Sequence, residues 1–452
     1  MINSINSLLC PNSVAVVGAS NNPDRWGYNV MKSILDAGYG GQVYPIHPKE
    51  REILGHCAYP SILDIAETVD MVSVCVAAPQ VPNVIREAVQ KKVKCAVVFS
   101  SGFREAGCPE LEEELADIIR GSELRLLGPN VQGLIHTPAK LSNIFGLDNP
   151  SAGCVGIISQ SGSVSSYISE RMSEEGIGIS TLVNLGNQID LCESDFLDSF
   201  AEDEKTRVVA LYLEGPKNGA RFKEALIRCA QVKPVVILKP GSTSAGVVAA
   251  RSHTASLAGD DSIFTYACRQ FGAVRCAGMQ EFIDTIHAFA AMPAVKGNRV
   301  AILSTSGGVG SIAVDELTKR GFQLAAFPEN VRSELCAKVQ KSSRIGNILD
   351  LSASLQDWQI VTKLLAQRYE KYFDSYFIMG ADGLAGLDIV IETLAGLSDK
   401  PIMSVFQCEG AVKRLAMERL RKIPLPVVDV PERAAQILSN MLQYNKRKGE
   451  TR

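Results

Sequence analysis

Hydrophobic and polar positions in the first third of the chain follow two alternating spacings. Residues 81–91 and 109–120 have apolar positions at helical intervals. Before, between and after them come short apolar runs rich in β-branched residues, at 13–17, 43–46, 71–76, 95–99 and 125–127. Strands that are apolar throughout are buried on both faces, and their alternation with helices is typical of a parallel sheet covered by helices. The pattern therefore predicts a doubly wound α/β domain over residues 1–136.

The same pattern occurs twice more along the chain. Further apolar runs cover residues 154–158, 179–183, 208–213 and 234–239, and then 299–303, 375–379, 401–406 and 426–428. Most end in a turn rich in Gly, Ser, Pro or Asn. We expect a loop near residues 136–153 and a linker near 292–298, which leaves two more domains over residues 150–292 and 298–452. The predicted fold class is α/β, with three doubly wound parallel sheets, and the shared plan of the last two suggests an internal duplication.

Composition narrows the classes of function. A chain of 452 residues has room for about three domains of roughly 150 residues. The net charge of -3 and the 6% of aromatic residues argue against nucleic acid as a partner. No apolar run approaches the roughly 20 residues of a membrane span, and the N-terminus lacks the pattern of a signal peptide. We expect a cytoplasmic protein with no membrane partner, whose scattered cysteines, with no CxxC among them, are buried hydrophobes and not metal ligands.

Gly18, Ala19 and Ser20 follow the first apolar run and precede a helical stretch. A helix N-terminus offers free backbone N–H groups and a partial positive charge, which suit a phosphate or pyrophosphate. The complete G-x-G-x-x-G pattern is absent, and Lys49 stands where an acidic residue would follow the second strand. A cation there favours a phosphorylated ribose, and so CoA over NAD. A glycine needed only for a strand-to-helix turn is the alternative.

A second turn, Ser159-Gln160-Ser161-Gly162-Ser163, is unusually rich in small hydrogen-bond donors and directly follows an apolar run. The segment 304–310 is similar. Both are candidate anion sites, and a tight structural turn is the alternative for each.

One of the five histidines stands apart. His253 lies in a stretch, 241–259, of almost entirely small residues. A loop of this composition suits a segment that admits another chain or swings between sites. Imidazole attacks phosphoryl groups when a carboxylate orients its other nitrogen, and Glu214 ends a predicted strand at the same sheet edge. We predict that His253 is catalytic, whereas structural or surface positions are expected for His47, His56, His136 and His287.

Six motifs occur in the order and at the spacing of a known family: 16–20 (Val-Val-Gly-Ala-Ser), 101–105 (Ser-Gly-Phe-Arg-Glu), 128–130 (Gly-Pro-Asn), 159–162 (Ser-Gln-Ser-Gly), 213–215 (Leu-Glu-Gly) and 251–254 (Arg-Ser-His-Thr). The chain resembles the α subunit of the NDP-forming acyl-CoA synthetases, in particular of ADP-forming acetate–CoA ligase. The α subunit of succinyl-CoA synthetase is a more distant match. The resemblance covers nearly the whole chain. Two departures, Asn347 to Asp350 and Val309, both fall in the third domain.

The resemblance implies a CoA-binding Rossmann-like domain followed by two flavodoxin-like ligase domains. It implies phosphorylation of His253, with Glu214 as the acid that steadies the imidazole. The CoA-binding residues that it implies are Gly18, Ala19, Ser20, Lys49, Ser101, Gly102 and Glu105. The phosphate and acyl substrate would be held by Asn130, Ser159, Gln160, Ser161, Gly162 and Asn187.

The implied reaction turns acyl-CoA, phosphate and ADP into a carboxylic acid, CoA and ATP. No ATP-grasp segment and no P-loop sequence is present, so we expect ADP or ATP and Mg²⁺ on a separate ATP-grasp β subunit, in an α2β2 complex. Three alternatives remain open at this stage. The chain could be a CoA or acyl-CoA sensor without turnover, an NAD-dependent dehydrogenase, or a succinate-type ligase.

Overall fold

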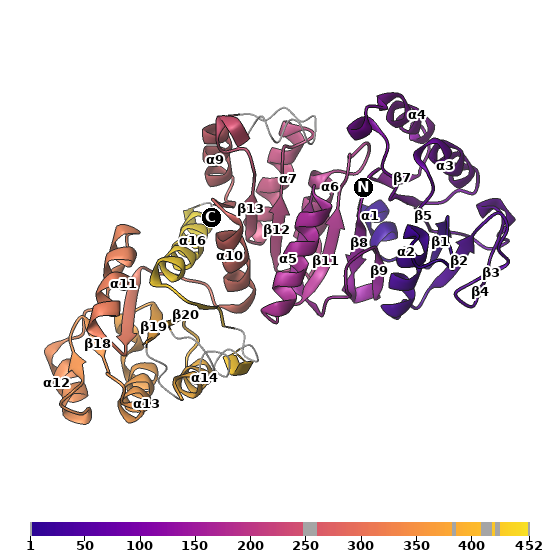
Figure 1. The fold of residues 1–452 in the computed structure, drawn as a ribbon. Helices are drawn as coiled ribbons and strands as arrows, with labels where there is room; N and C mark the ends of the chain where they lie inside the picture. The colour runs from indigo at the N-terminus through magenta and orange to yellow at the C-terminus, as the bar shows by residue number, and fades with distance from the viewer. Residues whose placement is uncertain (1, 247–259, 382–385, 408–417, 421–424, 451–452) are drawn as a thin grey trace. The chain divides into compact units, whose positions relative to one another are not determined.

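The computed structural model describes residues 2–246, 260–381, 386–407, 418–420 and 425–450 (Figure 1). Its contacts group the chain into two compact units, residues 1–277 and 278–452. The first unit contains two large sheets and the second unit contains one. The fold class predicted from the sequence is confirmed, since each large sheet is wholly or mainly parallel and carries helices. No helix in the described part of the chain has both the length and the apolar composition of a membrane span.

The first sheet is parallel throughout. Its strands lie in the order β2 (Gln42–Ile46), β1 (Ser13–Val17), β5 (Met71–Val74), β6 (Cys95–Val98) and β7 (Arg125–Leu127). A short hairpin, β3 (Glu52–Ile53) and β4 (His56–Cys57), follows β2. Side chains of β1 alternate between two cores. Val14 and Val16 pack with α1 (Ile2–Leu9) and α2 (Trp26–Asp36), whereas Ala15 and Val17 pack with α3 (Val81–Gln90) and α4 (Pro109–Ile119).

The second sheet begins earlier in the sequence than expected. Its strands are β14 (Val274–Cys276), β13 (Val235–Leu238), β12 (Val208–Tyr212), β10 (Ala152–Ser159), β11 (Ile179–Asn184), β8 (Gly133–His136) and β9 (Leu141–Ile144). Its helices are α5 (Gly162–Glu174), α6 (Glu193–Glu202), α7 (Gly219–Val232) and α9 (Asp261–Gln270). β8 and β9 are antiparallel additions at the edge. The loop predicted at residues 136–153 is therefore wrong for residues 141–144, which form β9.

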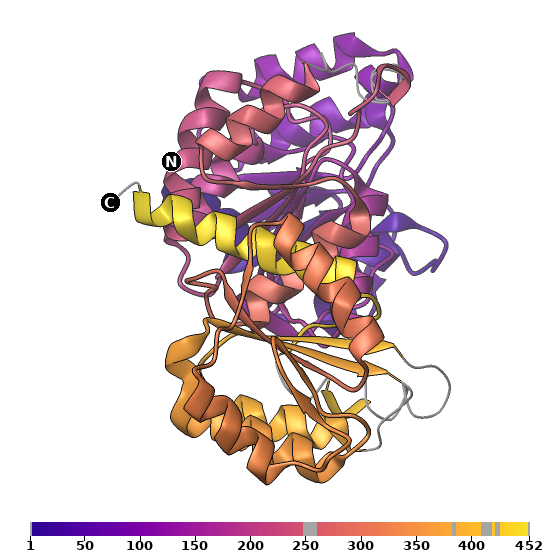
Figure 2. The same cartoon turned by 90° about the vertical axis from the view of Figure 1, so that its left-hand side faces the viewer.

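The second unit is a sheet between two helical layers. Its strands are β17 (Arg344–Ile345), β18 (Ile348–Asp350), β15 (Arg299–Ser304), β19 (Ser375–Ala381), β20 (Ile402–Gln407) and β21 (Val427–Val428), with β16 (Gln323–Leu324) beside β15. One core packs α10 (Met279–Ala291), α11 (Gly307–Lys319) and α16 (Pro431–Glu450) on one face. The other packs α12 (Glu329–Lys338), α13 (Leu355–Leu364) and α14 (Leu387–Leu397) on the opposite face (Figure 2).

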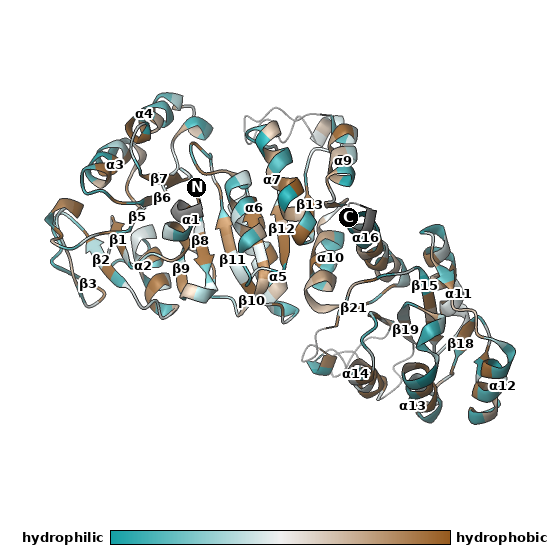
Figure 3. Cartoon of the chain, turned by 180° about the vertical axis from the view of Figure 1, so that it is seen from behind, coloured by the Kyte–Doolittle hydropathy of each residue, from teal (hydrophilic) through white to brown (hydrophobic). Residues whose placement is uncertain are grey.

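All three sheets share one order of parallel strands. In each sheet the earliest of the parallel strands lies between two later parallel strands, as in β2-β1-β5, β11-β10-β12 and β18-β15-β19. These strands are apolar (Figure 3), as expected for strands buried on both faces. The direction of strand order reverses beside the first strand, and ligands of doubly wound sheets bind at the carboxyl ends of the strands at that point. Three candidate ligand-binding edges follow from this order.

The turns after β10 and β15 have the same hydrogen bonds. The hydroxyl of Ser159 donates to the carbonyl of Ser161 at 2.7 Å and accepts from its amide at 3.2 Å. Ser304 makes the same two bonds to Ser306, at 2.7 and 3.1 Å. A helix starts at the next residue in each case. This local identity supports the duplication suggested by the sequence.

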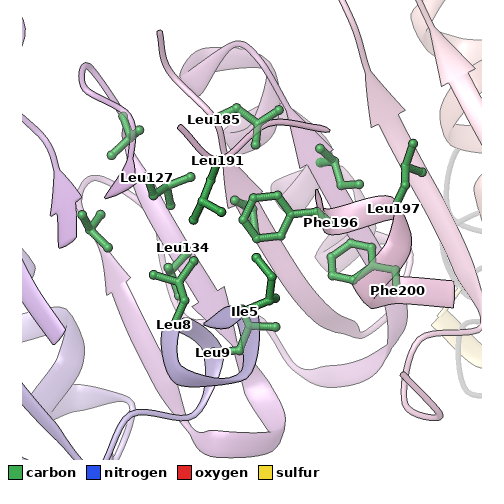
Figure 4. Close-up of a cluster of buried hydrophobic side chains, with 14 of the residues drawn as sticks. Ile5, Leu8, Leu9, Leu127, Leu134, Leu185, Leu191, Phe196, Leu197 and Phe200 are labelled. Atoms are coloured by element: carbon green, nitrogen blue, oxygen red, sulfur yellow. The ribbon is translucent and has the colours of Figure 1, made fainter. Parts of the chain in front are cut away.

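A single hydrophobic core joins the two sheets of the first unit (Figure 4). Ile5, Leu8 and Leu9 of α1 are buried together with Leu134 of β8 and with Phe196 of α6. The first and second sheets are therefore held as one body, and α1 is a central part of it.

We expect Leu8→Ala to lower the free energy of unfolding of the first unit by about 2–5 kcal/mol, because a leucine with no exposed surface leaves a cavity. Urea unfolding of the full chain, followed by circular dichroism, measures the change. Asn6→Ala is the matched control on the exposed face of α1, where a change within about 0.5 kcal/mol is expected. Equal effects of the two substitutions would contradict the central role of α1.

Candidate functional site

A cavity of about 810 Å³ lies at the edge where β1 and β5 end. Its lining includes Gly18, Ala19, Ser20 and Ser101, four of the residues that the sequence assigned to CoA. Gly18 has a φ of +84°, and a Cβ there would lie 2.7 Å from the carbonyl oxygen of Cys75. Only glycine fits this turn, which is the requirement that the structural alternative named, and Gly18 also borders a space of ligand size.

The first turn of α2 borders the same cavity. Arg25, at the N-cap, has an extended conformation and makes no side-chain capping bond to the helix. The amide of Tyr28 donates to the carbonyl of Arg25 at 3.1 Å, so the amides of Trp26 and Gly27 are the ones in this turn that could meet an anion. Lys49 is exposed just beyond Pro48 of the lining, and its amide donates to Nδ1 of His47 at 3.2 Å. Lys49 is not itself a lining residue, and its role beside a phosphorylated ribose stays a prediction.

Glu105 is held by a different set of partners from the cavity residues. One of its carboxylate oxygens accepts from the amides of Gly102 and Phe103, at 2.7 and 3.1 Å. The other accepts from Nδ2 of Asn187 at 2.6 Å. Burial raises the pKa of Glu105, but the bonds from Asn187 and the two amides outweigh it and hold the pKa below its usual value. Glu105 is therefore a carboxylate that contacts a residue predicted for the acyl and phosphate pocket.

Asn130 and Asn187 are brought together by their turns. The amide of Asn187 donates to the carbonyl of Pro129 at 2.8 Å, and Nδ2 of Asn130 donates to Oδ1 of Asn187 at 3.3 Å. Glu112, which is paired with Arg104, accepts a further bond from Asn187 at 3.0 Å. The sequence grouped the two asparagines by resemblance alone, and the structure places them in contact.

Some polar groups of the turn after β10 make hydrogen bonds within the protein, and others remain for a possible ligand. The hydroxyl of Ser159 is used within the turn. Gln160 spans to the end of β12, where its Oε1 accepts from the amides of Glu214 and Gly215 and its Nε2 donates to the carbonyl of Gly215 at 2.8 Å. Ser161 is the N-cap of α5 and makes no side-chain capping bond. The Ser161 hydroxyl and the first amides of α5, beginning at Gly162, are the groups best placed to hold a phosphate.

Glu214 is the second residue after β12, the strand that lies next to β10 in the sheet. Its side chain is buried, with 7% of the residue exposed, and its Oε2 has no hydrogen-bond partner within the described residues. Burial and the neighbouring Glu214 carboxylate raise the pKa of Tyr212 to about 12. A buried acceptor without a partner is costly to a folded protein, which suggests that a donor meets it in the working state. His253, the predicted donor, lies outside the described residues.

Gln132 makes hydrogen bonds to several segments around the turn after β10, and it was not singled out from the sequence. Its amide donates to Oδ1 of Asn184 at 2.6 Å, and its Nε2 donates to the carbonyl of Phe145 at 3.1 Å. Its Oε1 accepts from the hydroxyls of Ser165 and Ser166 on α5, at 3.2 and 3.0 Å. Its position two residues after Asn130 was the only available signal, because the partners come from distant segments.

Glu193 is a second buried carboxylate that the sequence did not indicate. It has no exposed surface, and its Oε2 has no partner in the described part of the chain. Its Oε1 accepts from the amide of Lys217 at 3.3 Å, three residues after Glu214. Burial raises its pKa, more than the bonds from backbone amides lower it. Glu193 therefore holds the backbone of Lys217, in the segment that follows Glu214.

Comparison with known proteins identifies the family. A family model described as a CoA binding domain matches residues 12–137, and one described as a succinyl-CoA ligase like flavodoxin domain matches residues 152–289. The α subunit of acetate–CoA ligase (ADP-forming) I from Pyrococcus furiosus is 33% identical over 99% of this chain and 99% of its own length. This chain belongs to the family of ADP-forming acetate–CoA ligase α subunits. The resemblance inferred from six motifs is confirmed.

Other members of the acetate–CoA ligase family differ in length. The ADP-forming acetate–CoA ligase of Methanocaldococcus jannaschii is 37% identical over 75% of this chain but only 48% of its own, so the chain spans about half the length of that relative. Among solved structures, acetyl-coenzyme A synthetase 1 of Ca. Korarchaeum cryptofilum, in complex with phosphate and ADP, has a TM-score of 0.92 and 31% identity. That match covers 98% of this chain and 97% of the solved chain.

Proposed function

We propose that this chain is the α subunit of an NDP-forming acyl-CoA synthetase, which converts acyl-CoA, phosphate and ADP into a carboxylic acid, CoA and ATP. One observation carries the proposal. The buried oxygen of Glu214, which has no partner among the described residues, and the uncapped first turn of α5 at Ser161 follow adjacent strands and are linked by Gln160. A carboxylate that orients an imidazole and a helix end that holds a phosphate are the two groups needed for transfer of a phosphoryl group to histidine.

In the first step, an oxygen of phosphate attacks the thioester carbonyl carbon of acyl-CoA. The carbon–sulfur bond breaks, an acyl phosphate forms, and the CoA thiolate leaves and takes up a proton. Ser161 and the first amides of α5 would hold the phosphate, while Asn130 and Asn187 would border the acyl group. The rate gain comes from fixing the two reactants in position and from facing the phosphoryl oxygens with backbone N–H groups.

In the second step, a ring nitrogen of His253 attacks the phosphorus of the acyl phosphate, and the carboxylic acid leaves as its carboxylate. Glu214 accepts a hydrogen bond from the other ring nitrogen and stabilises the positive charge of the imidazole. An oxygen of the terminal phosphate of ADP then attacks the phosphorus, so that the bond to histidine breaks and ATP forms. In the reverse direction the same steps activate an acid.

The nucleotide is assigned to a partner. We assign ADP or ATP, with Mg²⁺, to an ATP-grasp β subunit that joins this chain in an α2β2 complex in the cytoplasm. The α-subunit relatives of similar length, and the relative of about twice the length, support a division of this activity between two polypeptides. The domains proposed for this chain are residues 1–136 for CoA, 150–292 for the phosphohistidine, and 298–452 as a second ligase domain.

The test is reconstitution with the β subunit from the same source. The full chain and the β subunit together should release ADP from ATP over many turnovers only when an acid and CoA are both present, and a panel of acids identifies the substrate. The chain alone should be inactive. ATP formation from acyl-CoA, phosphate and ADP by the chain alone would overturn the assignment of the nucleotide to a partner. A complex inactive with every acid would contradict the ligase activity.

A further inference from the structure

Trp26 is the most conspicuous side chain at the cavity that begins at Gly18. It is the first residue of α2, it lines the cavity, and 43% of it is exposed. Its ring stacks on that of Phe145, with centroids 5.3 Å apart and 6° between the planes. One face of the indole is therefore covered by protein, while the remaining surface borders open space. An aromatic ring of this size left half-exposed at a cavity is well suited to cover an apolar group of a ligand.

The contacts of the aromatic rings indicate which end of the cavity the indole of Trp26 borders. Phe145 also contacts Phe99, at 6.1 Å between centroids, and Phe99 directly follows β6. His47 and Pro48, which line the cavity too, follow β2, and β2 is separated from β6 by two strands. The two ends therefore differ in chemistry. The β2 end has the imidazole of His47, with the exposed Lys49 two residues further along the chain. Towards β6 the cavity is bordered by the indole of Trp26, which is backed by the rings of Phe145 and Phe99.

CoA has two ends that match this division. Its phosphorylated ribose and pyrophosphate are anions, which suit Lys49, the turn at Gly18 and the first amides of α2. Its pantetheine arm carries two methyl groups and two amides and ends in the thiol. If CoA occupies the cavity, as the proposed function requires, we infer that the indole of Trp26 packs against the pantetheine arm. Trp26 would then recognise the pantetheine arm and help to position the thiol, while the nucleotide end of CoA lies towards β2.

The route beyond Trp26 agrees with this assignment. Ser100 and Ser101 line the cavity next to Phe99. The amide of Asn130 donates to the carbonyl of Ser100 at 3.0 Å. An arm that passes Trp26 towards the end of β6 therefore reaches the turn of Asn130, which the proposed function gives to the acyl group.

Fluorescence of the full chain tests the inference, because the sequence has only two tryptophans and the other, Trp358, is fully buried in the second unit. CoA is compared with 3′-phospho-ADP, which is CoA without the arm. CoA should change the emission of the wild-type chain and not that of Trp26→Phe, while 3′-phospho-ADP should bind without changing either. By calorimetry, Trp26→Ala should weaken CoA binding about tenfold and leave the affinity for 3′-phospho-ADP within about twofold.

The outcomes separate this inference from the proposed function. If Trp26→Ala weakens both ligands equally, or if 3′-phospho-ADP alone changes the emission of Trp26, the ring lies at the nucleotide end and the inference is wrong. Unchanged CoA affinity in Trp26→Ala overturns it as well, although the proposed function would stand. If CoA does not bind the wild-type chain in the calorimeter, the proposed function fails and the inference fails with it.

Discussion

Replacing His253 with alanine is expected to remove all acid-labile phosphate from the chain after incubation with the β subunit, labelled ATP and Mg²⁺. Among the described residues, the α5 turn offers no nitrogen nucleophile as strong as an imidazole, since Ser161 is a hydroxyl and Gln160 is held by backbone partners. Turnover should be lost together with the label. Autoradiography of the separated chain, before and after mild acid, gives the first result, and the coupled assay gives the second.

A histidine distant from the proposed site serves as control for the His253 experiment. His56→Ala, in the short hairpin β3–β4, should retain the wild-type label and turnover. Label that persists in His253→Ala would assign the phosphoryl acceptor to another residue and refute the proposed second step. Label without turnover in His56→Ala would indicate that the hairpin matters for a step after phosphorylation, which would not affect the assignment of His253.

Replacing Glu214 with glutamine is expected to lower turnover by about 100- to 10,000-fold, with little change in the affinity for CoA. The amide has nearly the shape of the carboxylate, so packing at the end of β12 should persist. It lacks the negative charge, however, and in a buried position that charge strongly stabilises a phosphorylated imidazole beside it. Steady-state kinetics of the complex, together with calorimetric CoA binding to the chain, measure the two quantities.

The exposed Glu202→Gln at the end of α6 provides the matched control for Glu214→Gln and should keep turnover within about twofold. The rate at which label enters His253 distinguishes two ways in which Glu214 could act. If Glu214 orients the imidazole, the label should appear slowly in Glu214→Gln. Wild-type labelling and turnover in this variant would remove Glu214 from the mechanism.

The strands that position the site were predictable from the sequence. Runs such as 14–17 and 208–213 have no charged residue and are buried almost throughout because both faces of the strand are covered, so the pattern needs no knowledge of the partner strands. The turn at Gly18 was predictable for a related reason, since a positive φ and a close carbonyl leave room for glycine alone.

The hairpin of β8 and β9 was missed because its polar residues are satisfied inside the protein. Asn143 has no exposed surface and accepts from the hydroxyl of Ser73 at 2.9 Å. Ser142 is equally buried and shares a 2.8 Å contact with Ser33. Polar residues at these positions indicate a solvated loop when read along the sequence, and only the distant partners reveal a strand.

The individual site residues were less predictable than the elements that carry them. Ser161 and Glu214 were identified as ends of strands, but the bridge that Gln160 makes between them depends on which strands are neighbours. Glu105 was grouped with CoA by its motif, whereas its contact with Asn187 comes from a helix and a turn 82 residues apart. Trp26 carried no signal beyond its place after a glycine turn, because its stacking partner, Phe145, directly follows the hairpin that was missed.

The core shared by α1, β8 and α6 has a consequence for exchanging parts between relatives. A hybrid protein joined between β9 and β10 would take β8 and β9 from one parent and β11, the strand that pairs with β8, from the other. It would also take α1 from one parent and the α6 surface that receives it from the other. Acyl-CoA preference is therefore best transferred by exchanging residues 1–277 as a single block. A hybrid joined between the first and second sheets should misfold unless the two parents have matching residues where α1, β8 and α6 pack together.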